Sequence, residues 1–251
     1  MRRVSVRVAA HEAEIARARF LSLVPEGFQE VEIGDTLELV AYTDHPGERR
    51  IREAFPSAVA AAVEPGWEER WRAFHHGVRA GGLWIGPPWE EPPADVPSVV
   101  IEPARAFGTG AHPTTRACVE LLARTGRGSL VDAGCGSGVL SVVAARLGFG
   151  PIVALDNDQA AVSATRVNAA KNVVQLEAHE SDVLRDPLPV ADVLVANIEL
   201  AAVESLLARW AGPRVITSGY PSRERPKAAG WRREERIELA GWAADRLARV
   251  G

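Results

Sequence analysis

The feature that most constrains the fold is the stretch Ser-Leu-Val-Asp-Ala-Gly-Cys-Gly-Ser-Gly at residues 129–138. An apolar run typical of a β-strand leads into Asp132, glycines follow at alternate positions, and an apolar pattern with helical spacing occupies residues 139–147. This order predicts a strand, a tight turn and a helix. Glycine accepts backbone angles that other residues avoid, and the first turn of a helix offers unpaired N–H groups. We therefore expect a small molecule to bind over the turn, against Gly134 and Gly136.

The spacing of these glycines narrows the choice of ligand. A dinucleotide-binding turn has the pattern G-x-G-x-x-G, but Val139 stands where the third glycine would be. A phosphate-binding loop needs Gly-Lys-Ser/Thr, and this turn contains no lysine. An almost uncharged turn headed by Asp132 suits a ligand that has no diphosphate and carries a cationic part. Apolar residues 151–155 lead into Asp156, and we expect its carboxylate to accept hydrogen bonds from two ribose hydroxyls.

The composition indicates a soluble globular protein, because 47% of its 251 residues are hydrophobic and that is enough for a full core. No run of about 18 apolar residues is present, so we expect a cytoplasmic protein without membrane contact. Cys118 and Cys135 lack metal-ligand spacing and suit a reducing compartment, and His112 has no second histidine at ligand spacing, so we expect no metal site. The formal net charge of −4 argues against direct binding to nucleic acid.

The order of predicted elements divides the chain into two domains. Near the start, the segments alternate as β-α-β-β-α-β, the ferredoxin-like arrangement, over residues 3–9, 11–23, 27–33, 36–42, 46–55 and 58–63. Residues 66–95 contain many prolines and glycines and break this periodicity, although residues 77–85 favour a short strand pair. We therefore predict a ferredoxin-like domain at 1–65, a linker at 66–95 and a larger domain at 96–251.

The larger domain alternates strands with helices, which predicts an α/β fold with a doubly wound parallel sheet and helices on both faces. In addition to the strand before the glycine turn, we predict strands at 97–102, 151–155, 173–178, 191–196 and 214–218. We predict helices at 116–124, 139–147, 158–171 and 200–210. Residues 231–239 and 242–250 break the alternation and predict a strand pair that adds an antiparallel edge to the sheet.

Polar residues directly after the predicted strands are candidate site residues, because a doubly wound sheet binds its ligand beyond the carboxyl ends of its strands. Asp182 follows the third strand, and it fits either a contact with an adenine amino group or a solvated loop carboxylate. Asn197 ends a continuous apolar strand and fits either a site residue or the cap of the next helix. Thr114 and Thr115 fit either a helix cap or a ligand contact.

Three motifs together resemble the PrmA-type methyltransferases, which are class I S-adenosylmethionine-dependent enzymes that modify protein eleven of the large ribosomal subunit. They are Phe-Gly-Thr-Gly-Ala-His-Pro-Thr-Thr at 107–115, Asp-Ala-Gly-Cys-Gly-Ser-Gly at 132–138 and Asn-Ile at 197–198. The resemblance covers residues 66–220 by motif and the front domain by topology. It implies a class I methyltransferase Rossmann-like sheet preceded by a small α+β ferredoxin-like domain that recognises the substrate.

The same resemblance implies an enzyme that methylates lysine and N-terminal amines of a ribosomal protein, with S-adenosylmethionine as cofactor. The cofactor contacts that it implies are Thr115, Gly134, Asp156 and Asn197. To these we add residues from the strand ends and from a loop that we expect to close over the cofactor: Asp132, Gly136 and Asp182, and Phe107 and Thr109.

Asn197 is the predicted catalytic residue. Methyl transfer from a sulfonium requires an aligned donor and amine and the exclusion of water. A lysine amine must first lose its proton, against an ordinary pKa of about 10.4, and burial favours the neutral form. We expect the side-chain oxygen of Asn197 and nearby backbone carbonyls to bind amine hydrogens and aim the lone pair, without a dedicated general base. Two alternatives stay open: an enzyme of this fold that acts on another protein lysine or a small amine, and a nucleotide-binding module without turnover.

Overall fold

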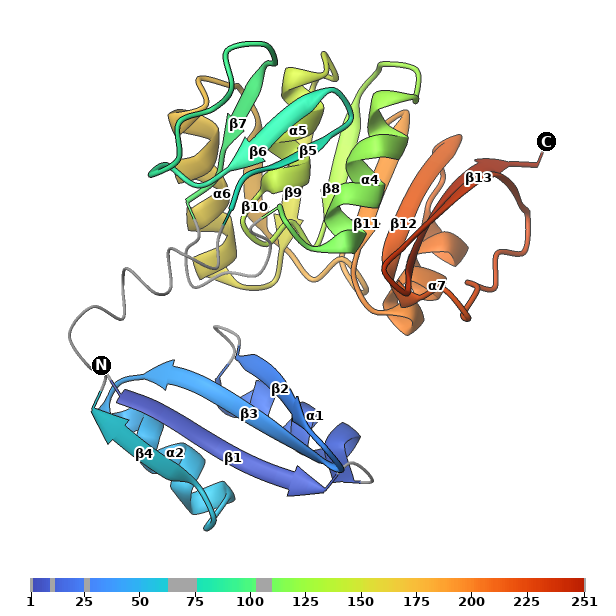
Figure 1. Ribbon diagram of the computed structural model, residues 1–251. Coiled ribbons are helices and arrows are strands. Elements are labelled where there is room, and N and C mark those ends of the chain that lie inside the picture. The colour runs from blue at the N-terminus through green and yellow to red at the C-terminus, as the bar shows by residue number, and fades with distance from the viewer. Residues whose placement is uncertain (1, 10–11, 25–27, 63–75, 103–109, 251) are drawn as a thin grey trace. The chain divides into compact units, whose positions relative to one another are not determined.

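The computed structural model describes residues 2–9, 12–24, 28–62, 76–102 and 110–250. The chain forms two compact units, Met1–Phe74 and His75–Gly251 (Figure 1). Each unit has a hydrophobic core of its own. The range 66–95, predicted as a linker, contains the paired strands β5 (Val78–Ala80) and β6 (Leu83–Gly86) of the second unit, as the pattern at 77–85 predicted.

In the described part of the first unit, four antiparallel strands form a sheet with two helices on one face (Figure 1). In chain order the elements are β1 (Arg2–Ala9), α1 (Ala13–Leu23), β2 (Gln29–Ile33), β3 (Thr36–Thr43), α2 (His45–Ala54) and β4 (Val59–Ala62). The strand order is β2-β3-β1-β4. Alternate residues of β1, Val4 and Val6, pack with Phe20, Leu39 and Ile51 in a core that excludes water. This confirms the predicted ferredoxin-like arrangement.

Local sequence signals explain the turns of this unit. Ile33 pairs with Thr36 across a two-residue turn, and Gly34 has a φ of 58°, which glycine adopts without strain. Helix α2 begins after Asp44, whose carboxylate accepts a hydrogen bond from the Gly47 backbone N–H at 2.8 Å. The predicted hairpin is therefore confirmed.

The second unit contains a mostly parallel sheet in which seven strands are described. They are β8 (Leu130–Ala133), β9 (Ile152–Asp156), β10 (Glu177–Glu180), β11 (Val193–Asn197), β12 (Arg214–Pro221), β13 (Trp231–Leu239) and β14 (Trp242–Arg249). Their order is β10-β9-β8-β11-β12-β14-β13. The strands from β10 to β12 are parallel, whereas β14 is antiparallel to β12 and β13 is antiparallel to β14. The doubly wound sheet and its antiparallel edge are thus confirmed, with β14 between β12 and β13.

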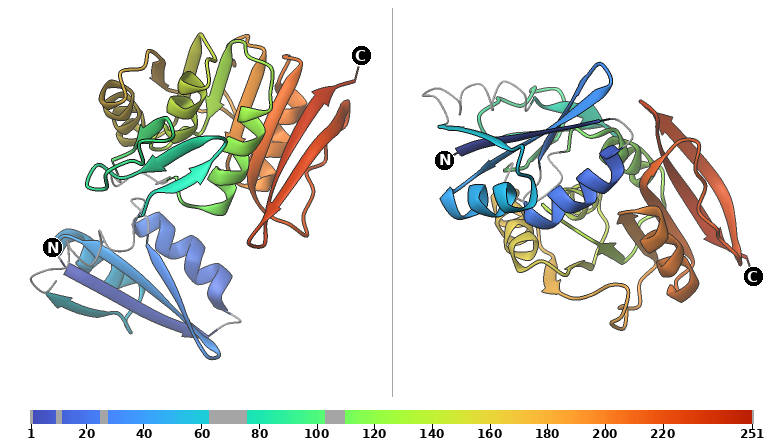
Figure 2. Two further views of the ribbon diagram at one scale, coloured as in Figure 1. Left: turned by 45° about the horizontal axis from the view of Figure 1, so that its top comes forward. Right: turned by 90° about the horizontal axis from the view of Figure 1, so that it is seen from below.

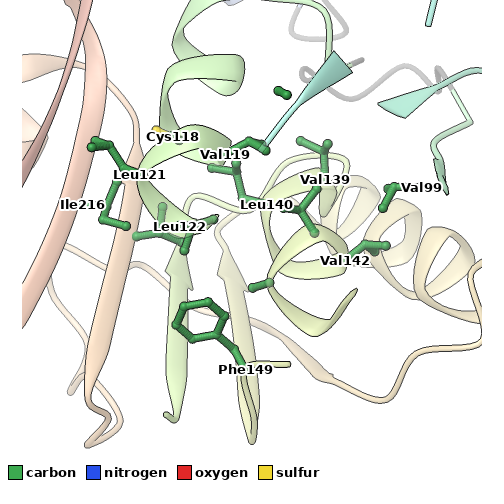
Figure 3. Close-up of a cluster of buried hydrophobic side chains, with 14 of the residues drawn as sticks. Val99, Cys118, Val119, Leu121, Leu122, Val139, Leu140, Val142, Phe149 and Ile216 are labelled. Atoms are coloured by element: carbon green, nitrogen blue, oxygen red, sulfur yellow. The ribbon is translucent and has the colours of Figure 1, made fainter. Parts of the chain in front are cut away.

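Helices cover both faces of this sheet (Figures 1 and 2). They are α4 (Pro113–Ala123), α5 (Val139–Arg146), α6 (Gln159–Lys171) and α7 (Leu200–Arg209). Helices α4, α5 and α6 pack on one face, where Leu122, Leu140 and Phe149 belong to one buried cluster (Figure 3). A small sheet of β5, β6 and β7 (Ser98–Val100) adds Val99 and its neighbours to that cluster. Helix α7 packs on the other face, against β12 and the buried Trp210.

Three predicted boundaries were wrong by three residues or more: the start of β10, the start of α4 and the end of β12, which runs to Pro221 rather than to residue 218. Strand β10 was predicted at 173–178, but Val173 has a φ of 53° and is 90% exposed directly after α6. Its N–H and that of Val174 donate to Ala170 and Ala169, so these valines belong to the helix end. Helix α4 was predicted from residue 116 but begins at Pro113.

Candidate functional site

The glycine turn between β8 and α5 leaves no room for side chains at its ends. Gly134, Gly136 and Gly138 have φ values of 77°, 54° and 77°, which L side chains rarely adopt. A Cβ on Gly134 would lie 2.5 Å from Cγ2 of Ile198, and one on Gly138 would lie 2.7 Å from the Thr165 side chain. The turn therefore requires glycine at these positions for its backbone angles and for close packing.

The carboxylate of Asp156 links this turn to the end of β9 through hydrogen bonds. Its Oδ2 accepts a hydrogen bond from the Gly136 N–H at 2.9 Å, and its Oδ1 accepts one from the Asp158 N–H at 3.0 Å. The Leu155 carbonyl accepts a third hydrogen bond, from Gly134, at 2.8 Å. Asp156 remains partly exposed, and a carboxylate has further lone pairs, so it can also accept hydrogen bonds from a ligand.

Asp132 lies beneath the turn and is only 1% exposed. The Ser141 hydroxyl on α5 donates a hydrogen bond to its Oδ2 at 2.6 Å. Burial raises the pKa of Asp132 to about 6; the hydrogen bonds from Ser141 oppose this rise, and the negative charge of Asp156 adds to it. Burial also raises the pKa of the Cys118 thiol and raises that of Cys135 to about 12, so neither cysteine is a nucleophile at neutral pH.

Asn197 lies at the end of β11, on the sheet face that α4 covers. Its side-chain Nδ2 donates a hydrogen bond to Oγ1 of Thr115, which is 1% exposed in the first turn of α4, at 3.3 Å. Because the amide nitrogen is hydrogen-bonded to Thr115, the amide oxygen Oδ1 of Asn197 points away from Thr115. The two residues, far apart in the sequence, form one polar pair with a defined orientation.

The observed starts of α4 and α7 show that Asn197, Thr114 and Thr115 are not helix caps. The N-cap of α7 is Glu199 rather than Asn197. The N-cap of α4 is His112, whose ring Nδ1 accepts a hydrogen bond from the Thr114 N–H at 3.4 Å and lies 2.7 Å from the Thr114 hydroxyl. Both threonines lie inside the helix, so a ligand contact remains open to Thr115.

The residue after Asn197 is held between two glycines. Ile198 packs against Gly134 on one side, and its N–H donates to the Ser218 carbonyl at 3.1 Å. Gly219 has a φ of 102°, and a Cβ there would lie 2.0 Å from the Ile198 carbonyl oxygen. A register shift interrupts β12 at this point. The backbone that carries Asn197 is therefore tightly confined.

An aromatic pair that the sequence analysis did not select lies next to this region. The rings of His112 and Trp242 meet edge to face, with centroids 5.1 Å apart and an interplanar angle of 68°. Trp242 begins β14 and pairs with Pro221, the last residue of β12. Burial lowers the pKa of His112, so its ring is neutral at neutral pH. The sequence offered no signal for this contact beyond a strand pattern at 242–250.

Asp182 organises the loop that follows β10. Its Oδ1 accepts a hydrogen bond from the Leu184 N–H at 3.0 Å, and its Oδ2 lies 3.3 Å from Nη1 of Arg185. These contacts fit the solvated-loop reading, and the 33% exposed side chain retains room for an adenine contact. The predicted contacts Phe107 and Thr109 lie outside the described residues.

Within the residues that the structure describes, no group of three or more histidine, cysteine, aspartate or glutamate residues could hold a metal ion. The helices among the same residues are all too short or too polar to cross a membrane.

The strand order, the glycine turn after β8 and the acidic residue that ends β9 define a class I methyltransferase fold. Comparison with known proteins narrows this class. The chain belongs to the family described as ribosomal protein L11 methyltransferase (PrmA), whose sequence profile matches residues 27–221.

Individual relatives agree with this assignment. The chain is 39% identical over 155 residues to the ribosomal protein L11 methyltransferase of Vibrio cholerae, covering 59% of this chain and 52% of that protein. It is 34% identical over 201 residues to that of Vibrio campbellii, covering 75% and 68%. The crystal structure of the ribosomal protein L11 methylase from Lactobacillus delbrueckii subsp. bulgaricus superposes with a TM-score of 0.63 at 25% identity, covering 70% of this chain and all of that one. The chain thus spans about half the length of the Vibrio cholerae relative.

Proposed function

We propose that this chain is an S-adenosylmethionine-dependent N-methyltransferase that acts on lysine or N-terminal amines of a ribosomal protein, with protein L11 as the first candidate. The family and the names of its relatives support this substrate. The observation that carries the proposal is the Asn197 amide, which Thr115 orients at the end of β11, the strand next to β8 and its glycine turn.

The residues around the turn fit S-adenosylmethionine. Gly134 and Gly136 turn the chain at the end of β8 without side chains, Asp156 offers carboxylate oxygens at a strand end, and no lysine is present in 129–138 to meet a diphosphate. When bound, S-adenosylmethionine supplies a methyl group on a positively charged sulfur. The residues that we propose to contact it are Phe107, Thr109, Thr115, Gly134, Gly136, Asp156, Asp182 and Asn197, whereas the buried Asp132 supports the turn from beneath.

Asn197 acts in this proposal by orienting the acceptor amine. Its Oδ1 accepts an N–H hydrogen bond and directs the nitrogen lone pair toward the glycine turn. Because the neutral amine is the nucleophile, the lysine proton leaves to solvent before transfer, and burial of the amine favours this loss. Pre-orientation of this kind lowers the barrier without a general base.

We further propose that the first unit recognises the protein substrate. It has its own core, so it can present a binding surface independently of the second unit. The net charge of −4 favours a protein over a nucleic acid as the partner. We place the activity in the cytoplasm, where the buried free thiols of Cys118 and Cys135 stay reduced.

The test combines the purified chain, labelled S-adenosylmethionine and a whole-cell extract. We expect label on a protein of the size of L11, and we expect Asn197→Ala to lose most of the turnover while S-adenosylmethionine binding stays measurable. Val190→Ala, on a side chain 96% exposed, is the matched surface control. Unchanged turnover in Asn197→Ala refutes the role of the amide. Label on a small amine or on another protein would make that molecule the acceptor in place of L11. Binding of S-adenosylmethionine without any methyl transfer would favour a non-catalytic nucleotide-binding module.

A further inference from the structure

Beyond Asn197, the same edge of the sheet ends in Trp242. The strand order places the turn at Gly134 after β8, Asn197 on the neighbouring β11, and Trp242 two strands further on, at the start of β14. Neighbouring strands lie about 4.8 Å apart, so β14 lies roughly 10 Å from β11 on the side away from the glycine turn. Asn197 is level with Ser218 and Ala244, so Trp242 lies two residues further along the strands than Asn197.

Asn197 and Trp242 also face the same way. Residues two apart on a strand share a face, and Val195 and Ala244 both belong to the buried cluster beneath α4 and α5. The first turn of α4 connects the two sites, because His112 contacts Trp242 and Thr115 holds Asn197. The N-cap and the first turn of one helix therefore link the aromatic pair to the amide.

We propose that Trp242, backed by His112, forms the wall of the acceptor channel and holds the methylenes of a lysine side chain while the lysine amine reaches Asn197. The inference rests on the proposed function. Trp242 is partly exposed, so its ring is available to a ligand. Lysine carries a flexible four-carbon stem that packs along apolar surfaces, and an indole face attracts an ammonium or methylammonium group. His112 adds no opposing charge, because burial lowers its pKa.

This wall makes the enzyme selective between two kinds of amine. A lysine nitrogen lies at the end of a long stem, which covers the distance from the wall to Asn197. An N-terminal nitrogen is bonded directly to Cα, so it offers no stem for Trp242 to hold. Loss of the indole therefore weakens the lysine acceptor and leaves the N-terminal acceptor nearly unchanged.

The experiment measures methyl transfer to two synthetic peptides, one with a single internal lysine and an acetylated N-terminus, the other with a free N-terminus and no lysine. We expect Trp242→Ala to raise KM for the lysine peptide roughly tenfold, which corresponds to about two uncovered methylenes. We expect kcat on that peptide to change less than about twofold, because the wall contacts the lysine stem equally before and during transfer. We expect the same of S-adenosylmethionine affinity, because the cofactor is not proposed to touch Trp242. Trp242→Phe keeps an aromatic wall and should restore KM to within about threefold of wild type.

The outcomes separate the wall from the proposed function. Wild-type transfer to either peptide supports the proposed function, and absence of transfer both to the peptides and to proteins of the whole-cell extract overturns it. Given wild-type transfer, an unchanged KM for the lysine peptide in Trp242→Ala overturns the wall alone. Equal losses on both peptides, or a parallel loss of cofactor affinity, also overturn it, because they indicate general damage. Val190→Ala again serves as the surface control and should match wild type on both peptides.

Discussion

Substituting Gly219 with alanine tests whether the tight backbone after Asn197 sets the activity. The new Cβ would lie 2.0 Å from the Ile198 carbonyl oxygen, 2.6 Å from its carbonyl carbon and 2.9 Å from its nitrogen. Contacts of a real Cβ stay above 3.0 Å, so this backbone must move by about 1 Å, the difference between 3.0 and 2.0 Å. A misplacement of about 1 Å costs on the order of 100-fold in rate. We therefore expect kcat to fall about 100-fold in Gly219→Ala.

The same substitution should also destabilise the fold. A φ of 102° costs an alanine roughly 1–2 kcal/mol, and overpacking against fixed backbone adds about 1–3 kcal/mol. Gly148→Ala is the matched control, because Gly148 has a φ of 89° and nothing within 4 Å of its added Cβ. The control should lose only the first contribution to the free energy of unfolding and should keep wild-type turnover.

Chemical denaturation and steady-state methyl transfer on the lysine peptide check both parts. Binding of S-adenosylmethionine to Gly219→Ala should persist, because the Asp156 hydrogen bonds to the turn do not involve Gly219. Wild-type turnover in Gly219→Ala would show that the confinement of Ile198 does not affect the rate of methyl transfer. A loss of stability no larger than that of Gly148→Ala would show that it does not affect the free energy of unfolding.

Two further substitutions test polar contacts of the site. Thr115→Val removes the acceptor for Asn197 Nδ2, so we expect kcat to fall roughly tenfold, the effect of one lost orienting hydrogen bond. Because Thr115 is also one of the proposed cofactor contacts, we expect S-adenosylmethionine affinity to weaken as well, and an unchanged kcat would contradict the orienting role. Asp132→Asn tests the buried carboxyl beside Ser141: because burial raises the pKa of Asp132 from 3.8 to about 6, the folded state binds the proton more tightly, and its ionisation costs stability as pH rises through this window. The unfolding free energy of wild type relative to Asp132→Asn should therefore fall by about 3 kcal/mol between pH 3 and 7, and parallel stability curves for the two proteins would contradict this assignment.

Features set by neighbouring residues could be predicted from the sequence. The glycine turn follows from alternate glycines after an apolar run, and the hairpin at Gly34 follows from a two-residue turn between alternating segments. The helix start at α4 was missed because a histidine ring, rather than a threonine hydroxyl, caps it. Strand β10 was misplaced because Val173 and Val174 are strand formers by composition, yet they close a helix through backbone hydrogen bonds.

Features set by the meeting of distant segments could not be predicted in the same way. Asn197 could be selected as a site residue because it ends a predicted strand, which is a local signal. Its hydrogen-bond partner Thr115 could only be described as a helix cap or a ligand contact, because the pairing joins distant segments. The contact between His112 and Trp242 depends on β14 lying next to β12, and the sequence indicated only an antiparallel edge. Such pairings depend on strand order, which hydrophobic periodicity does not encode.

The position of β14 has a consequence for the assembly of the second unit. Strand β13 is made before β14 but touches the rest of the sheet only through it. During translation, β12 thus keeps an unpaired edge until the residues of β14 have left the ribosomal tunnel, and a nascent chain interrupted before them lacks Trp242. A premature stop that removes this strand would therefore leave an aggregation-prone edge and remove the proposed wall of the acceptor channel in the same truncated product.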